Sequence, residues 1–247
     1  MYLAIIGGTG LSQLDGMEEM RHQVVSTPYG EPSGPITVGR MGGQEILFLP
    51  RHGYNHRIAP HEINYRANIW ALREMQVTKI LAVSAVGGIS ATMTPGSLCV
   101  PDQIIDYTWG RPSTFFEGDL ESVTHVDFSY PYDEQLRNAF LQAGAALSIP
   151  MIDGGTYGAT QGPRFETAAE IRRLEQDGCH VVGMTGMPEA VLARESDIRY
   201  ASLNVVGNWA AGRSGPRLVS MAEISQTLRV SMKDVRRVLG QILQHQE

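Results

Sequence analysis

The sequence predicts an α/β domain built on a largely parallel or mixed sheet. Short apolar runs at residues 2–6 and 79–86 end at the glycine pairs Gly7-Gly8 and Gly87-Gly88, which is typical of buried strands that enter tight turns. Longer segments between such runs carry apolar residues at helical spacing, and strands that alternate with helices form α/β sheets. The chain has no internal repeat or linker-like tract, so we expect one domain over residues 1–247.

Each expected element follows from a local pattern. Residues 36–40 and 45–49 flank Met41-Gly42-Gly43, which predicts a β-hairpin. Residues 61–76 follow Pro60 and have helical periodicity, so the first long helix is expected there. Similar patterns predict the remaining elements. These are helices over 133–147, 166–176, 189–196 and 221–244, and strands over 181–185 and 200–206.

Composition narrows the classes of function. The formal net charge of −6 argues against nucleic acid as a partner, because phosphate backbones require clustered Lys and Arg. No stretch approaches the ~20 apolar residues of a membrane span, and the run at residues 2–6 is too short for a signal peptide. We therefore expect a cytoplasmic protein without membrane contact. Cys99 and Cys179 lie far apart in no zinc or redox spacing, which favours buried, reduced thiols.

Hydroxyl and basic side chains follow several expected strands. In open α/β sheets ligands bind at the carboxyl ends of strands, so the hydroxyls of Thr9, Ser84 and Thr185 are expected to converge there with Arg51 and His52. Such a set can enclose a tetrahedral oxyanion such as phosphate.

Two alternatives stand beside this interpretation. The glycine turn at residues 7–10 is as typical of a structural turn as of a phosphate loop, since no P-loop lysine follows and Gln13 replaces the third glycine of a dinucleotide fingerprint. His56 and Arg57 are typical of a solvated loop. The nearby histidines lack acidic or thiol partners at metal-ligand spacing, so no metal is expected.

Longer motifs resemble the trimeric purine nucleoside phosphorylase and methylthioadenosine phosphorylase family. The motifs are Gly7-Gly8-Thr9-Gly10-Leu11, Arg51-His52-Gly53 with His56 and Pro60, Asn64-Tyr65-Arg66-Ala67-Asn68-Ile69-Trp70-Ala71-Leu72, Ser84-Ala85-x-Gly87-Gly88, Gln161-Gly162-Pro163-Arg164-Phe165-Glu166 and Gly183-Met184-Thr185-x-Met187-Pro188-Glu189. The resemblance implies a nucleoside phosphorylase fold, in which helices flank a mixed sheet with a distorted barrel. It also implies a homotrimer with active sites near subunit interfaces, a role in purine salvage, and inorganic phosphate as co-substrate without any cofactor.

The resemblance also implies roles for individual residues. Phosphate binding falls on Thr9, Arg51, His52, Ser84, the Ala85 backbone and Thr185. The purine falls on Phe165, Glu166, Val182 and Asn208. The sugar and its 5′ group fall on Met184, on His125 from a neighbouring subunit, and on Met221. Catalysis is expected from Asn208, which stabilises the departing purine, together with Arg51 and His52 at the phosphate.

The residues at the base and at the 5′ position indicate the substrate. Methylthioadenosine phosphorylases usually carry two Asp where this chain has Asn208 and Ala210, whereas family members for 6-oxopurines resemble it in Asn208 and Glu166. An Asn amide can present N–H to N7 or O6, and Glu166 can accept from N1–H of hypoxanthine. Met221 stands where ordinary nucleoside phosphorylases carry a His for the 5′-hydroxyl, and a thioether favours an apolar 5′-methylthio group.

These features together favour 5′-methylthioinosine as the substrate. The alternatives are 5′-methylthioadenosine, followed by inosine or guanosine. A nucleoside hydrolase has less support, because it needs a carboxylate-rich calcium site and the N-terminal segment has no Asp cluster. A purine- or phosphate-binding regulator on the same fold stays open.

Overall fold

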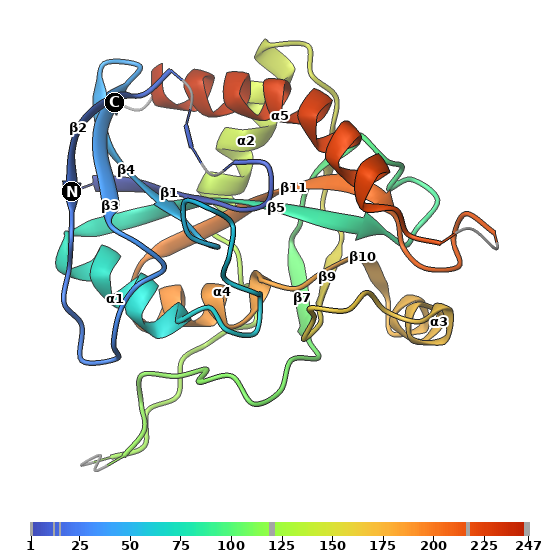
Figure 1. Cartoon of the computed structure of the whole chain (residues 1–247), viewed down its shortest axis with the longest axis horizontal. Helices are drawn as coiled ribbons and strands as arrows, with labels where there is room; N and C mark the ends of the chain where they lie inside the picture. The colour runs from blue at the N-terminus through green and yellow to red at the C-terminus, as the bar shows by residue number, and fades with distance from the viewer. Residues whose placement is uncertain (1, 12, 15, 119–121, 216–217, 245–247) are drawn as a thin grey trace.

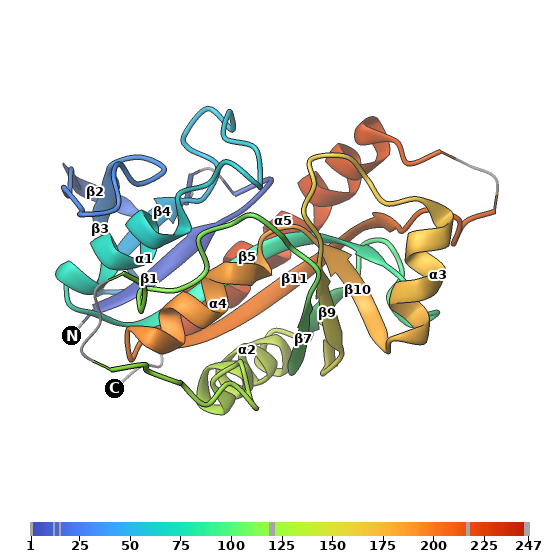
Figure 2. The ribbon, with the colours of Figure 1, turned by 90° about the horizontal axis from the view of Figure 1, so that it is seen from below.

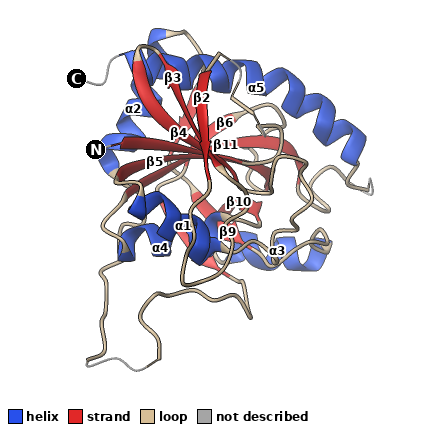
Figure 3. Ribbon diagram, turned by 60° about the vertical axis from the view of Figure 1, so that its left-hand side comes forward, coloured by secondary structure: helices blue, strands red, loops and turns tan. Residues whose placement is uncertain are grey.

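A mixed sheet with helices on both faces forms the framework of the protein. The computed structural model describes residues 2–11, 13–14, 16–118, 122–215 and 218–244. Helices α2 (Glu134–Ala146) and α5 (Met221–Gln244) cover one face of the sheet, and α1 (Tyr65–Glu74) and α4 (Gly186–Glu195) cover the other (Figures 1 and 2). Figure 3 shows the strands gathered between these helices. The predicted α/β class with a mixed sheet is confirmed.

Four parallel strands form the part of the sheet that carries most of the site. They are β4 (Gln44–Pro50), β1 (Tyr2–Gly7), β5 (Val77–Gly88) and β11 (Arg199–Trp209), in that spatial order. Their apolar side chains enter both faces of the core, as expected for a parallel sheet covered by helices. Because the strands are parallel, their carboxyl ends meet at one edge.

The predicted hairpin is confirmed, and it extends the sheet beyond β4. Strand β3 (Ile36–Met41) pairs antiparallel with β4, and Met41 lies opposite Gln44. Gly42 and Gly43 form the turn with φ values of 59° and 83°, which a two-residue hairpin turn with φ above zero at both positions requires. The edge strand β2 (Glu18–Gln23) pairs with β3 and was not expected, because its side chains are exposed and mostly polar.

The far end of β5 begins the second half of the sheet. Strand β10 (Cys179–Gly183) runs antiparallel to the last residues of β5, and β9 (Thr156–Ala159) and β7 (Gln103–Asp106) continue from it. Strands β6 (Leu98–Val100) and β8 (Met151–Asp153) add to β11. The strand predicted over 181–185 is β10, which begins and ends two residues earlier. The sequence did not predict β6, β7, β8 and β9, because three or four residues carry too little periodicity.

The helices lie where they were predicted. Helix α5 has the predicted bounds, and the other predicted helices begin at shifted residues. The helix expected over 61–76 begins at Tyr65, because the Asn64 side chain accepts a hydrogen bond from the Ala67 amide and caps it. The helix expected over 166–176 is α3 (Ala168–Gln176), which begins after a capping box between Thr167 and Glu170. Cys99 and Cys179 are buried and form no disulfide, as expected. Within the described ranges, no helix is long and apolar enough to cross a bilayer. One domain over residues 1–247 stays a prediction.

Candidate active site

A cavity of about 410 Å³ opens at the carboxyl ends of the parallel strands. Thr9 follows β1, Arg51 and His52 follow β4, Ser84 lies in β5, Thr185 follows β10, and all five line the cavity. The antiparallel pairing of β10 with β5 sets Val182 opposite Gly87, so the chain after β10 returns toward Ser84. The predicted convergence of these five residues is therefore what the fold produces.

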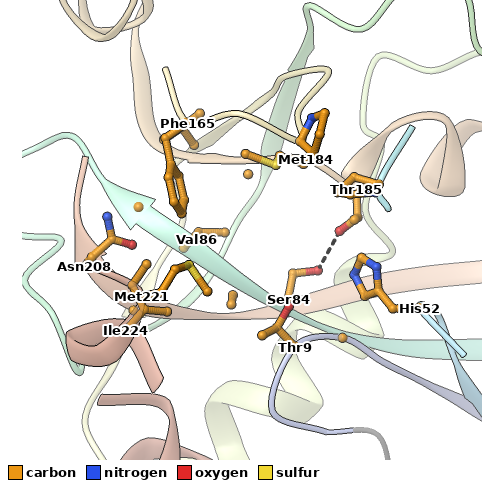
Figure 4. Close-up of a pocket in the computed structure, with 18 of the residues that line it drawn as sticks. Thr9, His52, Ser84, Val86, Phe165, Met184, Thr185, Asn208, Met221 and Ile224 are labelled. Atoms are coloured by element: carbon orange, nitrogen blue, oxygen red, sulfur yellow. Dashed lines mark hydrogen bonds between the residues drawn. The ribbon is translucent and has the colours of Figure 1, made fainter. Parts of the chain in front are cut away.

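Three hydroxyl groups gather at one end of the cavity (Figure 4). The Ser84 and Thr185 oxygens lie 3.5 Å apart, and both side chains are buried. Thr9 lies beside them in Figure 4. It follows Gly8, and a Cβ added to Gly8 would come 2.6 Å from the Val83 carbonyl oxygen. Only glycine therefore allows the loop to approach β5 this closely. The group can donate several hydrogen bonds to an oxyanion.

Arg51 lies fully buried beneath this polar end, with Glu189 of α4 as its partner. Nε and Nη2 of Arg51 donate to the two Glu189 oxygens at 2.6 and 2.7 Å, and Nη1 donates to the Val83 carbonyl at 3.0 Å. Burial alone would lower the pKa of Arg51, but the Glu189 carboxylate outweighs that effect and raises it. A guanidinium has five N–H groups, and these three bonds use three of them. Among the residues that the structure describes, the other two have no partner, and Arg51 lines the cavity where an anion would bind.

His52 faces the cavity as a hydrogen-bond acceptor. Its Nδ1 lies 2.8 Å from the Ile58 carbonyl oxygen, and a carbonyl only accepts, so Nδ1 carries the proton. Burial, followed by the neighbouring Arg51 charge, lowers the pKa of His52 to about 4. In the neutral ring Nε2 then carries a lone pair and can accept a hydrogen bond. The Ile58 carbonyl therefore makes His52 an acceptor on its cavity side.

The opposite end of the cavity is largely apolar. Phe165 and Val86 face it in Figure 4, with Val182 in the same wall. Asn208 borders this end, following a bulge in the pairing of β11 with β5 between Val206 and Asn208; such bulges re-aim side chains. Its Nδ2 donates to the Trp209 carbonyl at 2.7 Å. Oδ1 therefore stands on the cavity side, so the amide offers an acceptor where a donor was expected.

Glu166 supplies a carboxylate to the same apolar end. Thr160 donates its hydroxyl to Oε1 of Glu166 at 2.6 Å. Burial raises the pKa of Glu166, and the Thr160 hydrogen bond opposes that rise. The pKa of Glu166 therefore lies above that of an exposed Glu.

Apolar side chains line the space between the two ends. Met184 lies across the cavity from Met221 and Ile224. Met221 is 58% exposed. Met184 is held against Gly162, where a Cβ would come 2.5 Å from the methionine sulfur. His125 does not line this cavity and lies on an exposed loop, so its role from a neighbouring subunit stays a prediction. His56 and Arg57 are exposed at the cavity rim.

Arg111 and Tyr157 support the site, and the sequence analysis missed both. The buried Arg111 guanidinium donates to the carbonyls of Thr160, Gln161, Met184 and Met187, to the Gln161 side chain and to the Tyr65 hydroxyl. It thereby ties together the two loops that bear Glu166 and Thr185. The Tyr157 hydroxyl accepts from the Thr185 amide at 3.2 Å. Neither position has a local pattern that marks it, and Glu189 appeared only as part of a family motif.

The family follows from a match that spans almost the whole chain. A family model described as the phosphorylase superfamily matches residues 2–244. The chain belongs to the phosphorylase superfamily. Among curated members, a probable S-methyl-5′-thioinosine phosphorylase from Pseudomonas syringae pv. tomato is 55% identical over 240 residues, covering 97% of each chain. A 6-oxopurine nucleoside phosphorylase from Pyrococcus furiosus is 46% identical over 242 residues, covering 96% of this chain and 90% of that one.

Solved structures of the phosphorylase superfamily share the fold. Methylthioadenosine phosphorylase from Schistosoma mansoni in complex with adenine is 32% identical, with a TM-score of 0.94 over 98% of this chain and 91% of that one. A methylthioadenosine phosphorylase from an antarctic soil metagenomic library is 38% identical, with a TM-score of 0.90 over 97% of this chain and 84% of that one. The resemblance to this family and the predicted fold are confirmed.

Proposed function

We propose that this chain is a phosphate-dependent phosphorylase of S-methyl-5′-thioinosine, releasing hypoxanthine and 5-methylthioribose 1-phosphate. The observation that carries the proposal is one cavity with three chemically distinct regions. Hydroxyls and Arg51 suit an anion, Phe165 and Asn208 suit a purine, and Met221 suits an apolar 5′ group. The relative from P. syringae, named for this activity, supports the same conclusion.

The residues supply a mechanism without a covalent intermediate on the enzyme. Phosphate held by Thr9, Ser84 and Thr185 stabilises the positive charge that develops on the sugar as the bond to N9 breaks. A phosphate oxygen then bonds to C1′ with inversion. Hydrogen phosphate loses its proton when it becomes the sugar ester, and the purine gains one at N7. His52 Nε2 can accept the phosphate O–H, and Asn208 Oδ1 can accept the new N7–H.

The choice of base and 5′ group rests on side chains of this cavity. Neither position 208 nor position 210 is acidic, and an ionised Glu166 can accept from N1–H of a 6-oxopurine. Ile224 offers no hydrogen bond to a 5′-hydroxyl, and the Met221 thioether offers only a weak acceptor. Methylthioadenosine is the second candidate, because the superfamily's solved structures include phosphorylases named for it. Inosine and guanosine come third, supported by the relative from P. furiosus.

We also propose that the enzyme works as a homotrimer. Met221 is 58% and Phe165 40% exposed, and burying such apolar side chains in a subunit contact is favourable. In this arrangement His125 of a neighbouring copy would reach the open side of the 5′ region.

The test is an ultraviolet assay of purine release from methylthioinosine, methylthioadenosine and inosine, each with and without phosphate. We expect release that requires phosphate, with the highest kcat/KM for methylthioinosine. Release without phosphate would refute the phosphorylase, and binding without turnover would favour a regulator. A clear preference for methylthioadenosine would contradict the roles given to Asn208 and Glu166.

A further inference from the structure

Thr160 donates a hydrogen bond to one carboxylate oxygen of Glu166, which lines the cavity. Its Oγ1 lies 2.6 Å from Glu166 Oε1 and 3.3 Å from the Gly183 carbonyl oxygen. A hydroxyl has one proton, and the Gly183 carbonyl already accepts from the Thr160 amide at 2.8 Å. The short contact to a charged acceptor is the stronger one. Thr160 therefore donates to Oε1 of Glu166 and not to Oε2.

The main chain holds Thr160 in this position from both sides. Its amide donates to Gly183 of β10, and its carbonyl accepts from Arg111 at 3.3 Å. Arg111 also donates to the next carbonyl, that of Gln161, at 2.8 Å. Because both ends of the residue are fixed, removing the hydroxyl cannot be compensated by a small movement of the loop.

The charge on Glu166 decides which base it can read. An ionised carboxylate accepts the N1–H of a 6-oxopurine, whereas a protonated one can donate to the bare N1 of a 6-aminopurine. Burial raises the pKa of Glu166, and the Thr160 hydroxyl, followed by the backbone N–H of Glu166 itself, lowers it; Glu170 raises it and Arg164 lowers it to smaller extents. Arg164 and Glu170 pair with each other at 2.7 and 2.8 Å. Tyr107 and Arg173 line the adjoining pocket that Glu166 also borders.

We propose that Thr160 is a specificity-determining positioning residue, whose hydroxyl keeps Glu166 ionised and so selects 6-oxopurines over 6-aminopurines. The proposal rests on the proposed function, since it names the residue that sets the base preference of that site. It predicts a preference that depends on pH. The affinity for a 6-oxopurine relative to a 6-aminopurine decreases as pH falls and Glu166 becomes protonated. In a variant without the Thr160 hydroxyl, this decrease begins at a higher pH.

The test compares Thr160→Val, which keeps the shape of the side chain, with Thr160→Ser, which keeps the donor. Thr114→Val is the matched control, because Thr114 donates to Glu195 at 2.7 Å away from the cavity. Calorimetry gives the Kd of hypoxanthine and of adenine in saturating phosphate across pH, and kcat/KM is measured for the two methylthio nucleosides. Thermal melting verifies that each variant is folded.

In Thr160→Val we expect the preference for hypoxanthine over adenine to fall about tenfold, the effect of losing a hydrogen bond to a charged group. The pH at which the preference declines should rise, while Thr160→Ser and Thr114→Val keep the wild-type values. Equal weakening of both bases in Thr160→Val, or an unchanged ratio, would overturn the proposal. A wild type that binds the bases but cleaves neither nucleoside would refute the proposed function alone, because the binding ratio still tests Thr160.

Discussion

Replacing Glu189 with Gln tests whether Arg51 faces an anion in the cavity. The substitution keeps the shape of the side chain but removes the charge that neutralises a fully buried guanidinium, which Glu189 contacts through two hydrogen bonds. Removing one partner of a buried ion pair costs about 3–5 kcal/mol. For a chain of this length each kcal/mol lowers Tm by roughly 2–4 °C. We therefore expect the Tm to fall by about 6–20 °C without phosphate.

Phosphate should restore much of this loss. Arg51 lines the same cavity as Ser84 and Thr185, so an anion bound there would replace the missing charge. A ligand that binds only the folded state stabilises it by about 2.7 kcal/mol at a hundred times its Kd. In Glu189→Gln the gain in Tm from phosphate should exceed the gain in the wild type, because no carboxylate competes with the anion for Arg51.

The measurement is thermal unfolding with phosphate and with chloride at equal ionic strength. Glu170→Gln is the control, because Glu170 also forms a two-bonded pair with an arginine, Arg164, but at the surface. Such an exposed pair contributes only about 0–1 kcal/mol, and Gln preserves the capping box of α3. If phosphate stabilises Glu189→Gln no more than it stabilises the wild type, Arg51 does not bind the anion and the assignment is wrong.

Three further substitutions test other parts of the site. Burial, followed by the Arg51 charge, lowers the folded-state pKa of His52 from 6.5 to about 4. Between these two pH values the unfolded state therefore binds more protons than the folded state. The free energy of unfolding of the wild type should fall by up to about 3 kcal/mol as pH drops through this window. His52→Gln should lose this part of the pH dependence in urea unfolding, and an identical slope would contradict a neutral His52. Met221→His should raise kcat/KM for inosine relative to methylthioinosine by about tenfold, because it supplies a hydrogen bond to the 5′-hydroxyl; an unchanged ratio would place the 5′ group elsewhere. Arg111→Lys leaves carbonyls of both loops without a donor. It should therefore lower Tm and lower the kcat/KM of both methylthio nucleosides by the same factor. If the ratio of the two kcat/KM values changes instead, Arg111 has a role in base selection.

Local patterns accounted for the framework and for the grouping of the site. Apolar runs ending in glycines located β1 and β5, and the Gly42-Gly43 turn located the hairpin, because these patterns act within a few residues. The rule that ligands bind at the carboxyl ends of parallel strands predicted from the sequence that Thr9 and Arg51 lie at the same site.

The sequence by itself therefore determined the main strands of the framework, but not β2 or the short strands β6 to β9. It also determined which edge of the sheet binds a ligand and which kinds of group stand there. Only the tertiary structure decided how those groups are used. Glu189 lies 138 residues from Arg51 along the chain, so no local pattern pairs them. The Ile58 carbonyl makes His52 an acceptor, and the Trp209 carbonyl binds the Asn208 amide nitrogen so that the oxygen faces the cavity. The direction of a hydrogen bond and the charge of a buried group depend on neighbours that only folding brings together.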